Sequence, residues 1–181
     1  MKFKEKSTNN IFYKNIGLFL NHSSRYLAIF GGITLLLATL ISISSICGRI
    51  ILSSPIIGDF ELIEIACAVA IGSFLPLCHL KNGNIKVEFL TAKLSKKKIN
   101  ILDASSSLIF GFVSLFFCSR MLMGAIDMYV YREETMLLAF PVWISFLPVI
   151  LSFFLLTICC FYTFLLQIND CLLYTSPSPR D

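Results

Sequence analysis

The sequence predicts an all-α membrane protein with four transmembrane helices and short amphipathic helices at the membrane interface. Two bulk properties support this prediction: 56% of the 181 residues are hydrophobic and only 14% are charged, and the mean hydropathy is +0.80. Soluble domains average about 25% charged residues, so most of this chain is unsuited to water. The third observation is that the apolar residues fall into four long runs, which we expect to form a single integral membrane domain over residues 1–168.

The first apolar run predicts a span at residues 26–48. Between Arg25 and Arg49 lie 23 uncharged residues, and a helix of this length is about 35 Å long, enough to cross a bilayer. Ahead of this span, four apolar residues share one face of a helix: Phe12, Ile16, Phe19 and Leu20. This spacing predicts a first amphipathic helix that lies in the interface.

The second and third spans must include charged residues to reach across the membrane. The second, at residues 60–80, has 16 uncharged residues after Glu64, or about 24 Å of helix. It therefore needs Glu61 and Glu64 in its first turns, where acidic side chains are favourable because of the helix dipole. Asp59 is placed to cap this helix. The third span, at residues 104–126, similarly includes Arg120.

The fourth apolar run is too long for one crossing. Between Glu134 and Asp170 there are 35 uncharged residues, which would form about 52 Å of helix. Pro141 and Pro148 interrupt this run, so we place the fourth span at residues 147–168. Trp143 is expected at the interface, where the indole keeps its N–H in contact with water.

The distribution of lysine and arginine predicts the orientation. The N-terminal segment has five of these residues and the connection between the second and third spans has six, whereas the two other connections share three. Because cytoplasmic loops are enriched in lysine and arginine, we expect the N- and C-termini and the second connection to be cytoplasmic. The lysines of that connection are expected to contact membrane lipids, not nucleic acid.

The second connection also predicts a turn and a second amphipathic helix. Val87, Leu90 and Leu94 recur at i, i+3 and i+7, as on one face of a helix in the interface. Gly83 permits a sharp turn out of the second span, because glycine tolerates positive φ.

The sequence contains no pattern typical of catalysis, cofactor binding or metal binding. None of the seven cysteines has CxxC spacing, and His22 and His79 are not placed to face each other at mid-depth. We therefore expect no enzymatic activity, no cofactor and no metal.

Ionisable side chains at membrane depth are nevertheless candidates for a role in function or assembly. Here Arg49, Glu61, Glu64 and Arg120 all fall near the ends of spans. A bridge between Arg120 and Glu64 would neutralise both charges, and we expect such pairing to serve assembly. Small residues at i, i+4 in the second span, such as Ala68 and Gly72, are expected to let helices approach closely.

The order of motifs along the chain resembles a known family. Residues 58–90, GDFELIEIACAVAIGSFLPLCHLKNGNIKVEFL, look like its acidic second helix followed by a Gly-His-Ile-x-Val-Asp-x-Leu turn, with Asn84 and Glu88 in place of histidine and aspartate. Residues 133–156 include Pro141-Val142-Trp143 at the position of a Pro-x-Trp motif. These stretches are similar to those of the small (Q-type) transmembrane subunit of tripartite ATP-independent periplasmic (TRAP) transporters.

The resemblance implies a scaffold in the bacterial inner membrane. In such systems a large multi-span permease subunit carries substrate and ion, and a periplasmic substrate-binding protein delivers an organic anion, such as a carboxylate or a sugar acid. The small subunit supports the large one. Candidate subunit-interface or structural residues are Arg49, Glu61, Glu64, Gly83, Asn84, Glu88, Arg120, Pro141 and Trp143.

Two other functions are open to a chain of this kind. One is a stand-alone small four-helix transporter acting as a dimer, which is disfavoured because the first span has no acidic residue. The other is a membrane anchor subunit of a respiratory complex, which would require paired buried histidines. Residues 169–181 contain Ser-Pro-Ser-Pro and differ in composition from the preceding chain, so we expect a non-native or unstructured tail.

Overall fold

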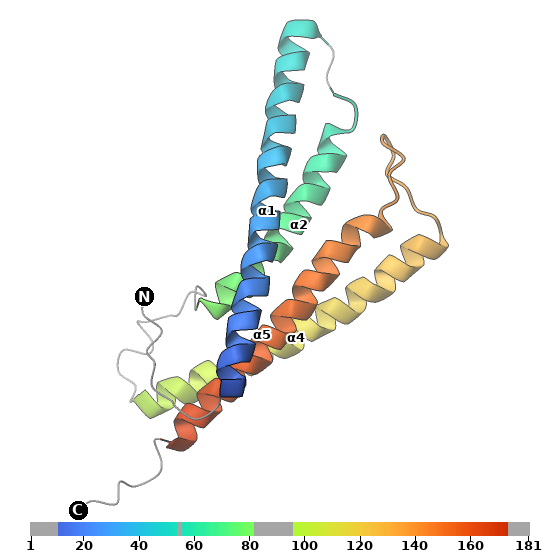
Figure 1. The fold of residues 1–181 in the computed structure, drawn as a ribbon. Helices are drawn as coiled ribbons and strands as arrows, with labels where there is room; N and C mark the ends of the chain where they lie inside the picture. The colour runs from blue at the N-terminus through green and yellow to red at the C-terminus, as the bar shows by residue number, and fades with distance from the viewer. Residues whose placement is uncertain (1–10, 54–55, 82–95, 174–181) are drawn as a thin grey trace, which may run out of the picture.

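The computed structural model describes residues 11–53, 56–81 and 96–173, which form four long helices (Figure 1). The helices are α1 (Ile11–Leu52), α2 (Asp59–Leu80), α4 (Lys96–Val130) and α5 (Trp143–Leu173). Each is long and apolar enough to cross a membrane, over Asn15–Ile51, Asp59–Leu80, Ile101–Val130 and Trp143–Ile168. The predicted class, an all-α protein with four membrane-spanning helices, is confirmed, and each predicted span lies inside one of these segments.

The N-terminal amphipathic segment is helical but continuous with the first span. α1 has 42 residues and is therefore about 63 Å long. Its first turns pack on α5: Gly17 lies against the phenol of Tyr162, and Ser24 Oγ lies 3.7 Å from Cys159 Sγ. The amphipathic pattern had predicted a separate helix lying in the membrane interface. The contact with α5 explains why this segment instead continues into the first span. The second amphipathic helix, at Val87–Leu94, and the turn at Gly83 lie outside the described residues.

The four helices form two hairpins. α1 packs on α2 and α4 packs on α5, and the hairpins meet along α2 and α5, with a smaller contact between α1 and α5. Figure 1 shows the hairpins diverging toward the turns that join their helices, while the α4–α5 connection extends back toward the start of α2. Among the described helices, only α5 covers α4 over an extended surface.

Small side chains fill the contact between α1 and its neighbours. Buried small residues recur every seven positions along α1: Ser24, Gly31, Ala38 and Ser45. At Gly31 the backbone of α1 lies against the Ser73 side chain and the Ala70 backbone of α2. Close backbone approach of this kind gives van der Waals packing where lipid removes the usual hydrophobic driving force.

Small side chains also fill the contact between α4 and α5. Its positions on α4 alternate by three and four residues, as in a coiled-coil seam: Ala104, Ser107, Gly111, Ser114 and Cys118. The Ser114 hydroxyl donates to the Phe153 carbonyl of α5 at 3.0 Å, and Ser107 donates to Gln167 Oε1 at 3.2 Å. These hydrogen bonds fix the register of the two helices in a setting without water.

The contact between α2 and α5 also uses a small residue. Gly72 of α2 lies against Val149 and Ser152 of α5. Of the predicted pair of small residues, Gly72 is therefore buried in a helix contact, whereas Ala68 is exposed.

α5 differs from the predicted fourth span at both ends. It begins at Trp143 and includes Pro148 without ending there. Pro148 is only six residues into the helix, so its missing N–H removes a single hydrogen bond near the start. At the other end, residues 169–173 of the predicted tail are helical, because the first helix-breaking residue after Ile168 is Pro177. The remaining tail, residues 174–181, lies outside the described residues.

Candidate functional site

The α4–α5 connection, residues 131–142, is a compact turn. The Thr135 N–H donates to the Phe140 carbonyl at 3.0 Å, and the Val142 N–H donates to the Glu133 carbonyl at 3.1 Å. The Thr135 hydroxyl also accepts the Phe140 N–H at 3.1 Å. Because these bonds join the two sides of the turn, the connection has a defined shape, with Leu137 and Leu138 at its tip.

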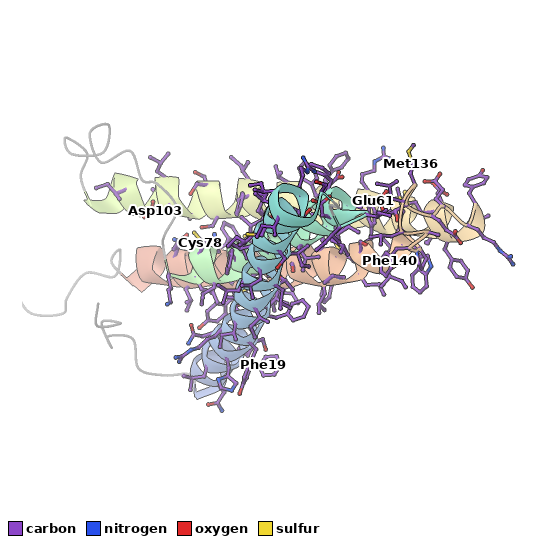
Figure 2. All side chains as sticks on the ribbon, turned by 90° about the horizontal axis from the view of Figure 1, so that it is seen from above. Phe19, Glu61, Cys78, Asp103, Met136 and Phe140 are labelled. Carbon is purple, nitrogen blue, oxygen red and sulfur yellow. The ribbon has the colours of Figure 1, made fainter. Side chains whose placement is uncertain are left out.

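A carboxylate on α2 holds the tip of this connection. Glu61 accepts the N–H of Leu137 at 2.9 Å through one oxygen and the N–H of Leu138 at 3.1 Å through the other. Figure 2, which looks from above, shows Glu61 near the labelled Met136 and Phe140 of the connection. We call this arrangement, Glu61 with the backbone of Leu137 and Leu138, the Glu61 clamp. It joins the two helical hairpins at one end of the molecule.

Gly58 permits the tip to approach α2. Its φ of 81° is in the left-handed region, where glycine alone is unstrained. The Leu138 side chain lies over the glycine, in the space that a Cβ atom would fill. Gly58 was not among the predicted site residues, although glycine directly before an acidic helix start is a signal for such a turn.

A second carboxylate ties the start of α2 to α1. The Ser45 hydroxyl donates to Asp59 Oδ2 at 2.5 Å, and Asp59 Oδ1 accepts the Phe60 N–H at 2.9 Å. The expected role of Asp59 as N-cap is wrong: Gly58 occupies that position and Asp59 is the first helical residue. The first turn of α2 thus holds α1 through Asp59 and the α4–α5 connection through Glu61.

The predicted Pro141 and Trp143 line a groove beside the connection. The groove has a volume of about 340 Å³ and is lined by Tyr129, Val130, Arg132, Glu133, Glu134, Pro141 and Trp143. The Trp143 ring meets Tyr129 edge to face, with centroids 5.5 Å apart. This contact joins the start of α5 to the end of α4.

The other predicted site residues do not join this cluster. Arg49 and Glu64 are exposed on α1 and α2, and Arg120 is exposed on α4 with its guanidinium 5.5 Å from the centre of the Phe116 ring. The predicted bridge between Arg120 and Glu64 is wrong, because both side chains are exposed and α2 and α4 share no extended contact. Three further candidates, Gly83, Asn84 and Glu88, lie outside the described residues.

The histidines and acidic residues show no metal-binding arrangement in the described part of the chain. No group of three or more His, Cys, Asp or Glu side chains in residues 11–53, 56–81 and 96–173 could hold a metal ion. His22 meets the Tyr26 ring with centroids 4.6 Å apart, and His79 meets Phe110 at 5.7 Å. The expected absence of metal and cofactor stays a prediction.

Comparison with known proteins identifies a family that this chain resembles over most of its length. The sequence model of a family described as "Tripartite ATP-independent periplasmic transporters, DctQ component" matches residues 23–170. The matched segment includes α2, α4, most of α1 and most of α5. Among curated proteins and solved structures, none matches the chain significantly.

Proposed function

The chain belongs to the DctQ family, the small component of TRAP transporters, and from this membership we propose that it scaffolds the large permease subunit. The large subunit would carry out ion-coupled uptake of an organic anion, such as a carboxylate or a sugar acid. The family is a transporter component and not an enzyme. The sequence resemblance at residues 58–90 and 133–156 supports the same assignment.

The placement of side chains by size is the observation that best supports a scaffold. Small residues fill the contacts between helices, whereas large apolar residues point outward, including Leu36 (67% exposed), Ile71 (65%) and Ile109 (64%). Exposed apolar helix faces of this kind suit lipid and another membrane subunit. The surfaces available for binding another membrane subunit are therefore the outer faces of the helices.

The proposed orientation places the Glu61 clamp on the periplasmic side. We place the chain in the bacterial inner membrane. The many lysines of the second connection favour a cytoplasmic location for that connection and for both termini. The opposite ends of the helices, with Glu61, Pro141 and Trp143, would then face the periplasm. There they would lie near the surface on which a substrate-binding protein meets the transporter.

Family membership favours this role over the two alternatives drawn from the sequence. A stand-alone dimeric transporter and a respiratory anchor subunit both belong to other families, and no feature of the described residues points to either. His22, for example, contacts Tyr26 on its own helix α1, whereas His79 of α2 contacts Phe110 of α4.

Co-purification tests the proposed function. The chain is co-expressed with the large TRAP permease subunit of the same operon, an affinity tag is placed on the large subunit, and the membranes are extracted in mild detergent. We expect the chain to elute with the large subunit at a fixed ratio. An unrelated four-helix membrane protein expressed in the same way is the control for non-specific recovery. Recovery no better than this control would contradict the scaffold role.

A further inference from the structure

The outward face of α4 differs from the face that packs on α5. The packed face contains the small residues from Ala104 to Cys118. The outward face is defined by exposed residues at helical spacing: Ile109, Phe116, Arg120, Met123 and Asp127. Residues at these positions lie on the opposite side of the helix from the seam. We call them the outer face of α4.

Within the predicted spans, α4 carries the charged Arg120, whereas α1 and α5 carry no charged side chain. Residues 26–48 of α1 and 143–168 of α5 contain no charged side chain, which suits contact with lipid. Arg120 lies ten residues before the end of α4 at Val130, or about 15 Å along the axis. A position inside the predicted span is an unusual place for a cation that faces lipid.

Arg120 has no acidic partner in the described part of the chain. Its guanidinium lies over the ring of Phe116, on its own helix, at 5.5 Å from the centroid. Phe116 is 58% exposed, and Met123, about one turn after Arg120, is 57% exposed. The cation is therefore surrounded by apolar side chains on a surface that no described helix covers.

We propose that the outer face of α4 is the surface on which the large permease subunit docks, with Arg120 paired to a carboxylate of that subunit within the membrane. This inference rests on the proposed function. An arginine suits the position because its planar guanidinium bonds a carboxylate through two parallel hydrogen bonds. Asp127, seven residues on along the same face, offers the opposite charge to a basic group of the partner.

Site-specific photo-crosslinking tests the location of the interface. A benzophenone amino acid is placed at Ile109 or Met123 on the outer face of α4, and at Leu36 or Leu151 on the uncharged faces of α1 and α5, all of which are exposed. The variants are co-expressed with the large subunit. Crosslinks to the large subunit from the two α4 positions are expected. Crosslinks from α1 or α5 positions without any from α4 would overturn the proposal.

Substitution of Arg120 tests the charge pair. Arg120→Leu is expected to weaken binding to the large subunit by about 30-fold or more, as for loss of one partner of a buried charge pair. Arg120→Lys should retain part of the affinity, and Arg25→Leu, an exposed position on α1, should retain nearly all of it. Full binding by Arg120→Leu would mean that Arg120 pairs with a lipid phosphate, and the proposal would fail.

The two proposals fail in different ways. If the unmodified chain does not co-purify with the large subunit, the scaffold role itself is wrong. If the complex forms but the α4 probes do not react with the large subunit, only the docking surface is wrong. Because the crosslinking variants keep Arg120, this result does not depend on whether Arg120→Leu folds.

Discussion

Replacing Gly31 by alanine is expected to destabilise the protein, because the added methyl group would push α1 away from α2. A Cβ atom at Gly31 would lie 2.7 Å from Ser73 Cβ and 3.2 Å from the Ala70 carbonyl oxygen, so α1 and α2 would have to move apart. At the adjacent Gly32 a Cβ atom would meet nothing within 4 Å. Both glycines lie on α1 and both are replaced by alanine, so Gly32→Ala is a matched control.

The magnitude follows from two opposing contributions. Each substitution gains about 1 kcal/mol of helix propensity, since glycine is that much less favourable than alanine in a helix. At Gly31 the overpacking of α1 against α2 costs about 1–3 kcal/mol. Gly32→Ala should therefore stabilise the protein slightly, and the difference between the two variants should equal the overpacking cost.

Unfolding of the purified protein in mild detergent measures this difference. The free energy of unfolding is obtained by titration with SDS and monitored by the fluorescence of the single tryptophan, Trp143. We expect Gly31→Ala to unfold at lower SDS than Gly32→Ala. Equal stability of the two variants would show that α1 and α2 are not in close contact at Gly31.

Three further substitutions test the end of the molecule that holds the α4–α5 connection. Glu61→Ala should speed hydrogen exchange of the amides at the tip of the connection, while Glu64→Ala, which removes an exposed carboxylate, should leave their exchange unchanged; equal effects would refute the clamp. Ser45→Ala leaves a buried carboxylate of α2 without one donor and should cost about 1–3 kcal/mol in SDS unfolding, with the exposed Ser44→Ala as control. Gly58→Ala should cost at least about 1–2 kcal/mol, because φ is 81° there; an unchanged unfolding curve would contradict this backbone conformation.

The number, type and position of the helices could be predicted from the sequence, because length and hydropathy decide which segments cross a membrane. The start of α2 is an example: the short apolar run after Glu64 required Glu61 to lie in the first turn, and the structure places it there. The continuity of α1 was not predicted. The amphipathic pattern before Arg25 is the same whether the segment lies on lipid or packs on α5.

Contacts between helices were harder to predict. The Arg120–Glu64 bridge assumed that α2 and α4 also meet near Glu64, whereas their ring contact is at His79 and Phe110, and no local pattern in the sequence encodes where two helices meet. The partners of Glu61 are backbone N–H groups, and these have no sequence signature. One signal was present and missed: small residues recur every seven positions from Gly17 to Ser45 and mark the packed face of α1.

The mass of the intact assembly shows whether this chain is a stoichiometric subunit of the permease. The complex is purified through a tag on the large subunit and measured by native mass spectrometry. A scaffold subunit predicts a species whose mass is that of the large subunit plus 20.4 kDa for this chain. Finding the chain only as a free species, or only as multiples of its own mass, would contradict the scaffold role.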